Sequence, residues 1–231
     1  MQQFFTPDID LTSESYSFNE VESKHMAKVL RKNRGDLLHL TNGRGQLITA
    51  KLSLVSPKNC VVKLLEIKEI PASKTAIHMI VAPTKNISRF EWFLEKATEL
   101  GVYKITPVLC DRSERKHIKY ERFEKIIHAA LKQSLRAYAP ILEPLTPLKE
   151  IEVNRPTFMA HCEDSPKESL KSAVNGQANC SILIGPEGDF SKAEIAWANE
   201  QNITAVHLGS NRLRTETAAL AALHTALLMN Q

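Results

Sequence analysis

The sequence predicts an α/β protein with a parallel sheet, preceded by a small β-rich domain. From residue 76 onward, short apolar runs alternate with helical stretches, a pattern typical of parallel strands covered by helices on both faces. Before residue 72, three strand-like runs instead follow one another with turn residues between them. We therefore expect a first domain at residues 1–72 and a second at residues 73–231.

In the first domain, EVESKHMAKVLR (20–31) predicts a short amphipathic helix with a basic end. Three strands are predicted after it, at residues 37–41, 47–55 and 60–67. Asn42-Gly43 supplies the turn of the first hairpin. The stretch PASK (71–74) has the composition of a linker to the second domain.

Five apolar runs of the second domain predict buried strands, at residues 76–83, 104–110, 156–162, 180–185 and 203–208. Three helices should begin at capping boxes, which start at Ser88, Ser165 and Ser191. Two further helices are predicted at residues 119–138 and 215–230. The last of them consists almost wholly of Ala, Leu and Thr, so we expect it to be buried.

The composition of the 231-residue chain is that of an ordinary globular protein, with 43% hydrophobic and 24% charged residues. No apolar run approaches the roughly 20 residues of a membrane span. The first residues, MQQFFTPDID, lack the features of a signal peptide. We therefore expect a soluble, cytoplasmic protein. Its four cysteines form no C-x-x-C pair, so no metal site is expected.

The charge is distributed unevenly along the chain. Residues 1–139 hold 23 Lys and Arg against 15 Asp and Glu, a net charge of +8, whereas residues 140–231 hold 7 against 11, a net charge of −4. Such asymmetry indicates a polyanionic partner bound by the front of the molecule. A solvated basic face is the alternative interpretation.

Two loops stand where ligands bind in parallel α/β sheets, beyond the carboxyl ends of strands. In GPEGDFS (185–191), Gly185 and Gly188 can adopt φ > 0 and let a ligand approach the backbone, while Pro186 stiffens the loop. A tight turn whose glycines serve only geometry is the alternative. No G-x-G-x-x-G after a strand and no P-loop motif is present, so neither nucleotide site is supported.

The second loop, HLGSNRLRTETA (207–218), carries Arg212 and Arg214 directly before the buried last helix. Thr215 and Glu216 begin that helix. The arginines could be solvated surface charges, and Glu216 could simply complement the helix dipole. Two unusual loops at strand ends nevertheless favour a binding site over loops that serve only the fold.

At these residues the sequence resembles the RsmE family of SPOUT methyltransferases, which methylate N3 of one uridine in 16S rRNA with S-adenosylmethionine. The most specific matches are L-I-G-P-E-G at 183–188, L-G at 208–209 and L-R-T-E-T-A at 213–218. Weaker matches extend the resemblance over nearly the whole chain: H-x-x-x-V-L-R at 25–31, R-x-E at 89–91, E-L-G at 99–101, I-T-P at 105–107 and Q-S-x-R at 133–136.

The resemblance implies a PUA-like, RNA-binding β-barrel at residues 1–72 and an α/β domain with a deep C-terminal trefoil knot at residues 73–231. The two loops would lie side by side at the knot and hold S-adenosylmethionine. The cofactor-binding residues that it implies are Leu183, Gly185, Pro186, Glu187, Gly188, Leu208, Gly209, Leu213 and Thr215. It also implies a homodimer and, as substrate, the 16S rRNA of the small ribosomal subunit.

Three positions depart from the family pattern. Asp189 stands where the family often has Gly, so we expect that this position need not be left-handed. Asn211 and Arg212 stand where an arginine and an apolar residue are usual, which leaves the role of Arg212 open. Lys132 replaces a frequent acid before Gln133.

Uridine N3 carries a proton that must leave before the nitrogen attacks a methyl donor, so a base and a stabiliser of the developing anion are expected. We assign charge stabilisation to Arg214 and consider Glu187 and Glu216 as base or orienting group. Either acid could instead only hold a loop. Which carboxylate takes the proton is left open by the sequence.

Phosphate contacts should position the RNA. The candidates are basic residues and residues of the matching motifs: His25, Arg31, Lys32, Arg34, Arg89, Arg112, Arg115, Gln133 and Arg136. Ordinary helix-surface polarity is the alternative for Arg89, Gln133 and Arg136. At the level of the whole protein, the alternatives are a SPOUT methyltransferase for tRNA or 23S rRNA, a catalytically inactive RNA-binding relative, and a small-molecule α/β enzyme.

Overall fold

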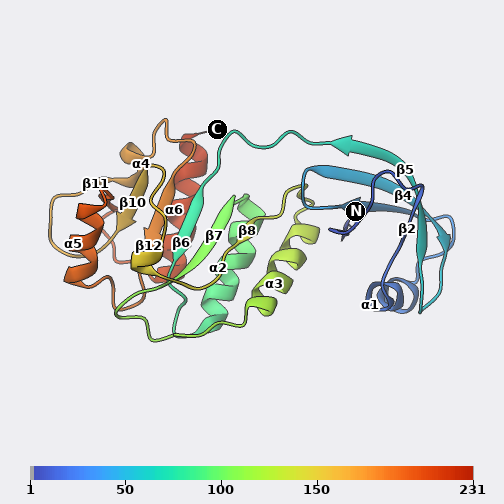
Figure 1. Ribbon diagram of the computed structural model, residues 1–231, viewed down its shortest axis with the longest axis horizontal. Coiled ribbons are helices and arrows are strands. Elements are labelled where there is room, and N and C mark those ends of the chain that lie inside the picture. Colours follow the sequence, from blue (N-terminus) through green and yellow to red (C-terminus); the bar gives the residue numbers. More distant parts are fainter. Residues whose placement is uncertain (1–2, 231) are drawn as a thin grey trace. The chain divides into compact units, whose positions relative to one another are not determined.

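The computed structural model describes residues 3–230, shown in Figure 1. The chain divides into two compact units. The first comprises the chain up to residue 72 together with residues 131–139, and the second comprises residues 73–130 and the chain from residue 140 onward. The sequence gives no sign that residues 131–139 belong with the first unit.

The first unit is built on a five-stranded sheet with the order β1-β3-β4-β5-β2. The predicted strands are confirmed as β3 (Leu37–Thr41), β4 (Gln46–Leu54) and β5 (Val61–Glu69), which pair antiparallel. Two three-residue strands, β1 (Gln3–Phe5) and β2 (Ser15–Ser17), were not predicted because they are too short to show a period. Alternating side chains such as Leu38, Leu40 and Ile48 form the core of this unit.

The predicted helix at residues 20–31 is shorter and irregular. It begins as α1 (Glu20–Lys24), where the Asn19 side chain accepts a hydrogen bond from the Glu22 N–H. It continues as a π-helical turn, His25–Val29, that buries Met26. The helix cannot continue through Arg31, whose φ of 50° is left-handed.

Residues 131–139 close one side of the first unit. The Gly45 N–H donates to the Ala137 carbonyl (2.9 Å), and the Ala139 N–H donates to the Gly43 carbonyl (2.9 Å). The Tyr138 hydroxyl donates to the Ile70 carbonyl at 2.8 Å. These contacts form because α3 (Tyr120–Gln133) ends at Gln133 and Leu135 turns the chain with a φ of 56°. The helix is therefore five residues shorter at this end than predicted.

The second unit is built on an eight-stranded sheet in which every ladder is parallel. Its main path has the order β11-β13-β10-β12-β6-β7-β8, and β9 pairs with β7 off this path. The five predicted strands are confirmed as β6 (His78–Val81), β7 (Lys104–Leu109), β10 (Thr157–Ala160), β12 (Ser181–Ile184) and β13 (Thr204–His207). Three two-residue strands were missed: β8 (Ile141–Leu142), β9 (Thr146–Pro147) and β11 (Glu168–Ser169).

Helices cover both faces of this sheet, as predicted. Successive residues of β6 point to opposite faces: Met79 and Val81 join one apolar cluster, and Ile80 joins another. The first cluster includes residues of α2 (Ile87–Leu100), α3, α4 (Leu170–Ala173) and α6 (Thr215–Met229). The second includes residues of α5 (Lys192–Glu200) and of the 3₁₀-helix Leu148–Glu150.

The three predicted capping boxes have different outcomes. The box at Ser191 is confirmed, because Ser191 and Glu194 each accept a hydrogen bond from the other's backbone N–H. The box at Ser88 is wrong by two residues, since Asn86 caps α2 and accepts from the Ser88 N–H. The box at Ser165 is also wrong, because Ser169 caps the short helix α4 there.

The fold class is confirmed: an α/β unit with a parallel sheet accompanies a small β-rich unit. The chain leaves β13, passes through the loop at 208–214 and enters α6, whose first residue bonds to Gly185. This is the crossing at which the family resemblance places the knot. Within residues 3–230, none of the helices is both long and apolar enough to cross a membrane.

Candidate functional site

Three loops meet at one edge of the parallel sheet. The strands β13, β10 and β12 are adjacent, and their carboxyl ends lead into residues 208–214, 161–167 and 185–191. Two of these loops were predicted from the sequence. The loop after β10 was not, because its position beside the other two depends on a strand order that no local pattern reveals.

The loop at 185–191 is held by Asp189. Its N–H donates to the Pro186 carbonyl (2.9 Å), which closes a tight turn. Its carboxylate accepts from the N–H groups of Phe190 and Cys162, both at 2.8 Å. The side chain therefore joins the end of β10 to the loop after β12.

The expectations for the backbone of this loop were wrong. Asp189 has a φ of 62°, so the left-handed position is Asp189 itself, while Gly185 and Gly188 are outside that region. The two glycines are needed for close packing instead. A Cβ at Gly185 would lie 3.1 Å from the Phe190 ring, and one at Gly188 would lie 3.2 Å from the Cβ of Arg112.

The loop at 208–214 is anchored where α6 begins. The Thr215 hydroxyl donates to the Gly185 carbonyl at 3.1 Å, so the two predicted loops lie side by side. Gly209 has a φ of 123°, a conformation that favours glycine. Arg214 occupies the N-cap position of α6 and is exposed, whereas Thr215 and Glu216 are buried.

Two adjoining cavities open between the three loops, with volumes of about 320 and 400 Å³. Residues shared by both linings are Ala160, Cys162, Ile184, Arg212, Leu213 and Ala218. The smaller cavity is completed by Gly185, Pro186, Glu187, Asp189, Arg214 and Thr215. The larger one is completed by His161, Lys167, Val206, His207, Leu208, Gly209, Ser210 and Asn211. The six shared residues make the two cavities parts of one continuous site.

Seven of the nine predicted cofactor residues line these cavities: Gly185, Pro186, Glu187, Leu208, Gly209, Leu213 and Thr215. Leu183 does not, because its side chain is buried in the apolar cluster on the opposite face of the sheet. Gly188 does not either. Its carbonyl accepts from Arg112 Nη1 at 2.9 Å on the outside of the loop.

His161 is a site residue that the sequence did not identify. Its ring is buried, with 7% of the residue exposed, and Nδ1 has no hydrogen-bond partner among residues 3–230. Burial lowers the pKa of His161, and the nearby ammonium of Lys167 lowers it further, so both favour the neutral ring over the charged one. Lys167 also holds the loop, since its Nζ donates to the carbonyls of His161 (2.9 Å) and Glu163 (2.6 Å).

The three predicted catalytic residues are not equivalent. Arg214 and Glu187 line the smaller cavity, and Glu187 Oε1 accepts from the Lys85 N–H at 3.0 Å. Glu216 is absent from both linings. It is buried, its Oε1 lies 3.8 Å from Arg89 Nε, and its Oε2 has no hydrogen-bond partner in the described part of the chain. The geometry therefore favours Glu187 over Glu216 for contact with a bound substrate.

Two predicted RNA contacts brace the site from outside. Arg112 donates to the carbonyls of Gly188 and Phe190, which fixes the loop after β12. Arg115 donates to the carbonyls of Thr84 (3.1 Å) and Lys85 (2.7 Å), in the loop before α2. Both guanidinium groups thus have structural partners that the sequence did not predict.

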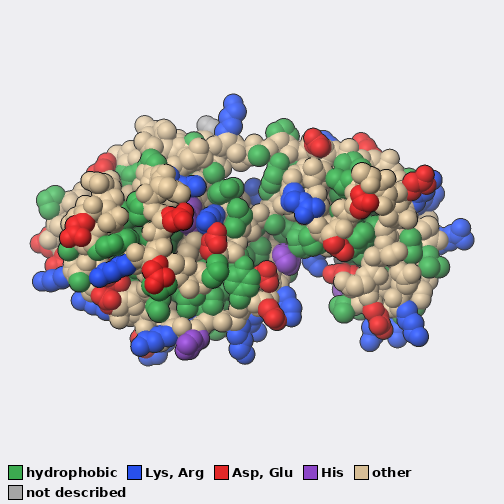
Figure 2. All heavy atoms as spheres, in the orientation of Figure 1, with side chains coloured by type: hydrophobic (Ala, Val, Ile, Leu, Met, Phe, Trp, Pro, Cys, Tyr) green, Lys and Arg blue, Asp and Glu red, His purple; other side chains and the backbone are tan. Residues whose placement is uncertain are grey.

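The other predicted RNA residues are distributed over both units. Arg89 lies on α2 and pairs with Glu216. Gln133 and Arg136 lie in the segment that belongs to the first unit. His25, Arg31 and Arg34 are exposed on that unit, and Lys32 is partly buried. Figure 2 shows basic side chains interspersed with acidic ones over the visible face.

Comparison with known proteins identifies the family. A family model described as an RNA methyltransferase domain matches residues 71–227, and an RNA methyltransferase PUA domain matches residues 18–65. The chain belongs to this RNA methyltransferase family. The resemblance to the RsmE family is thereby confirmed, because relatives named ribosomal RNA small subunit methyltransferase E match most of the chain.

Solved structures of similar proteins share the fold of this chain over nearly its whole length. A probable rRNA-methyltransferase from Porphyromonas gingivalis is 34% identical, with a TM-score of 0.91 over 100% of this chain and 98% of that one. The ribosomal RNA small subunit methyltransferase E of Neisseria gonorrhoeae, bound to S-adenosyl methionine, is 25% identical. Its TM-score is 0.88, and the match covers 99% of this chain and 98% of that one. The enzyme of that name from Rickettsia conorii is 29% identical over 86% of this chain and 83% of its own.

Proposed function

We propose that the protein is an S-adenosylmethionine-dependent methyltransferase that methylates N3 of one uridine in the 16S rRNA of the small ribosomal subunit. The observation that carries this proposal is the pair of adjoining cavities between the loops after β10, β12 and β13. A relative of the same fold binds S-adenosyl methionine and is named as a small subunit methyltransferase.

The cavities have the features that a bent nucleoside cofactor requires. Apolar side chains such as Ile184, Leu213 and Ala218 can contact the adenine faces, while backbone groups near Gly185 and Gly209 can bond its edge. Binding of the cofactor would expose the buried Nδ1 of His161, which has no hydrogen-bond partner among residues 3–230, as a further polar contact. When bound, the cofactor supplies an electrophilic methyl group. The remaining catalytic work falls to side chains of the protein.

Arg214 and Glu187 flank the smaller cavity, and we assign the chemistry to them. The Arg214 guanidinium would stabilise negative charge on O2 or O4 as uridine N3 loses its proton. The Glu187 carboxylate, positioned by the Lys85 N–H, would accept that proton or orient the base. Glu216 would act as a positioning residue that holds Arg89 on α2 for the RNA.

Methyl transfer from labelled S-adenosylmethionine tests this function directly. Small subunits that lack native modification are the substrate, with naked 16S rRNA, large subunits and tRNA alongside. Label mapped to N3 of one uridine in the small subunit is the expected result. Label in tRNA or 23S rRNA would assign a different substrate, and cofactor binding without label in any RNA would indicate an inactive RNA-binding relative.

The role of Arg214 has its own test. Arg214→Ala should lower the rate of methyl transfer about a hundredfold, as loss of one anion-stabilising donor does elsewhere. Cofactor affinity should change little, because the charge acts on the uridine. Arg212→Ala, in the same loop, is the matched comparison. A rate for Arg214→Ala within about threefold of wild type would remove the assigned role.

A further inference from the structure

The sheet of the first unit carries a groove whose charged lining is entirely basic. Its volume is about 450 Å³, and it lies where strands β4 and β5 meet the loop before β3. The lining residues are Arg34, Gly35, Lys51, Leu52, Ser53, Lys63 and Leu65. Of the three cations, only Arg34 was predicted to contact RNA.

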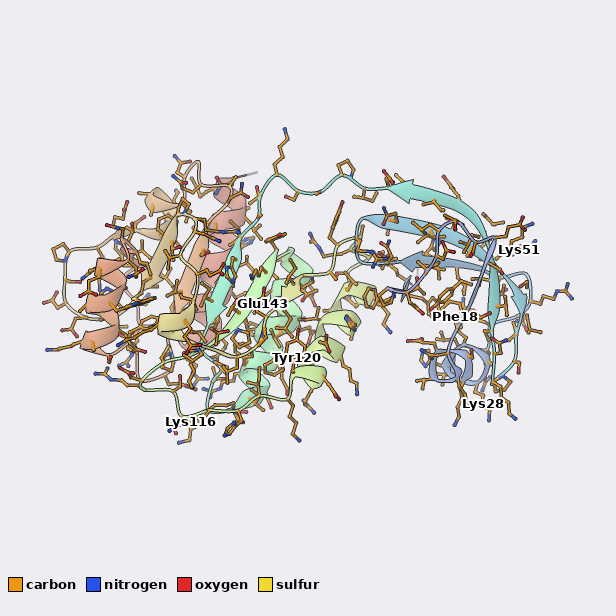
Figure 3. The ribbon with its side chains drawn as sticks, in the orientation of Figure 1. Phe18, Lys28, Lys51, Lys116, Tyr120 and Glu143 are labelled. Atoms are coloured by element: carbon orange, nitrogen blue, oxygen red, sulfur yellow. The ribbon has the colours of Figure 1, made fainter. Side chains whose placement is uncertain are left out.

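The two lysines oppose each other in the sheet. Lys51 of β4 is paired directly with Lys63 of β5 in the antiparallel ladder. Directly opposed residues have Cβ atoms about 4.5–5.5 Å apart, and like charges at such positions disfavour the pairing. Both side chains are exposed, and Figure 3 shows Lys51 on the outside of the unit and Phe18 within it. A bound anion would offset this repulsion.

Within the part of the chain that the structure describes, the cations of the groove have no ion-pair partner. Among residues 3–230, no carboxylate lies within 4.0 Å of the Lys51 or Lys63 ammonium or of the Arg34 guanidinium. Asp36 is close in sequence, but its carboxylate accepts a hydrogen bond from the Asn33 N–H at 3.0 Å. The three cations are therefore available to an external anion.

The groove is also held in shape by its backbone. The Gly35 N–H donates to the Leu52 carbonyl (2.8 Å), and the Leu52 N–H donates to the Asp36 carbonyl (2.9 Å). Gly35 has a φ of 98°, and a Cβ there would lie 3.9 Å from Lys51 Cε, so the lysine stem rests over the glycine. These backbone bonds hold Gly35, which follows Arg34, against strand β4, and Arg34 and Lys51 both line the groove.

Apolar side chains flank the cations. Leu37 is paired with Lys51 on the other side of β4, and it is 56% exposed. Leu65, in the groove lining, is 52% exposed. Cations alternating with exposed apolar surface suit a nucleic-acid strand, whose phosphates and sugar or base faces alternate in the same way.

We propose that the Lys51–Lys63 groove binds the phosphate backbone of the substrate RNA, with Arg34 as the third contact. The proposal rests on the proposed function, because that function supplies an RNA substrate. It adds two residues, Lys51 and Lys63, that match no family motif. Strand register alone brings them together.

The test compares full-length K51Q/K63Q with the matched control K58Q/K68Q, which removes two exposed lysines of the same unit outside the groove. Binding to naked 16S rRNA and to small subunits is measured over a series of salt concentrations. Loss of two phosphate contacts should reduce the slope of log affinity against log salt by about 1.4–1.8. K51R/K63R should keep the wild-type slope. The control K58Q/K68Q should reduce the slope less than K51Q/K63Q does.

Two outcomes would overturn the proposal. An unchanged salt slope for K51Q/K63Q would mean that neither lysine contacts phosphate. Loss of binding to small subunits with unaltered binding to naked rRNA would assign the groove to a ribosomal protein. S-adenosylmethionine affinity and methyl transfer by the wild type are measured in parallel. Failure of the proposed methyltransferase function would then be distinguished from failure of the groove to bind RNA.

Discussion

At the scale of single residues, Asp189 shows how a departure from a family pattern can keep the pattern's geometry. A left-handed conformation costs most residues roughly 1–2 kcal/mol, but Asp tolerates it better because its side chain can bond locally. Here the carboxylate bonds the N–H of Phe190 and that of Cys162. The side chain therefore offsets the strain that glycine would avoid.

This explanation predicts an order of stability among variants of Asp189. Asp189→Ala keeps the strain and loses both hydrogen bonds, so we expect it to lower the free energy of unfolding by about 2–3 kcal/mol. Asp189→Gly loses the bonds but relaxes the backbone, and should be less destabilising than Asp189→Ala by about 1 kcal/mol. Urea unfolding measures both. Equal losses would show that the left-handed backbone stores no strain.

His161 is the second residue whose role only the structure reveals. Its ring lines the larger cavity, and the buried Nδ1 lacks a hydrogen-bond partner within the described residues. His161→Phe should therefore weaken S-adenosylmethionine binding about tenfold, the loss expected for one buried hydrogen bond. His161→Asn keeps a polar atom near the Nδ1 position and should retain more affinity. Wild-type affinity for the Phe variant, measured by calorimetry, would mean that the cofactor does not contact Nδ1.

At the scale of elements, the segment between β7 and α3 braces the site. Arg112 Nη1 bonds two carbonyls of the loop after β12. Arg112→Ala should therefore weaken S-adenosylmethionine binding about tenfold, because the loop loses two charge-assisted bonds. Arg112→Lys should lose less. The sequence instead predicted that Arg112 contacts RNA. In that case Arg112→Ala should leave cofactor affinity unchanged and reduce the slope of log RNA affinity against log salt by about 0.7–0.9.

The amino end of strand β6 makes stability depend on pH. His78 is buried there, with Nε2 bonded to the Thr106 hydroxyl (2.7 Å) and Nδ1 near the Ser181 hydroxyl (3.3 Å). Burial, helped by Lys104 and Arg155, lowers the pKa of His78 to about 3 from 6.5. Between these values the unfolded chain binds a proton that the folded chain does not, so stability falls as the pH falls.

The expected slope from His78 is up to about 1.4 kcal/mol of unfolding free energy per pH unit between pH 6.5 and 3. His161 acts in the same direction because burial also lowers its pKa. His78→Gln should flatten this part of the stability curve, whereas the exposed His224→Gln serves as control. Urea unfolding at several pH values measures the slope. An unaltered slope in His78→Gln would mean that His78 is not the titrating group.

The elements also show what the sequence could and could not predict. Long apolar runs predicted every strand that lines the site, and the motifs predicted two of its three loops. The loop after β10, with His161 and Cys162, was missed because strand order comes from long-range pairing. Glycine is needed at 185 and 188 because Phe190 and Arg112 pack closely against these positions, and neither contact has a local sequence signal. The left-handed Asp189 was missed for the same reason.

At the scale of the whole molecule, the chain passes between its two units three times. Helix α3 begins in the second unit, where Phe123 and Ile127 are core residues. Its end leads into residues 131–139, whose backbone completes the first unit through Gly43 and Gly45. Unfolding of α3 should therefore release hydrogen bonds of the first unit, even though the proposed cofactor cavities lie entirely in the second.

This connection predicts that the cofactor protects distant amides. A ligand at about 100 times its Kd reduces the population of states that lack its site about a hundredfold. If α3 opens with the site, S-adenosylmethionine should slow hydrogen exchange at the Gly45 and Ala139 amides by up to that factor. The Leu64 amide, which donates to Glu14 at 2.9 Å, is the control within the first unit. Unchanged exchange at Gly45 would show that residues 131–139 stay folded with the first unit when the second opens, so the two units would be thermodynamically independent despite their shared helix.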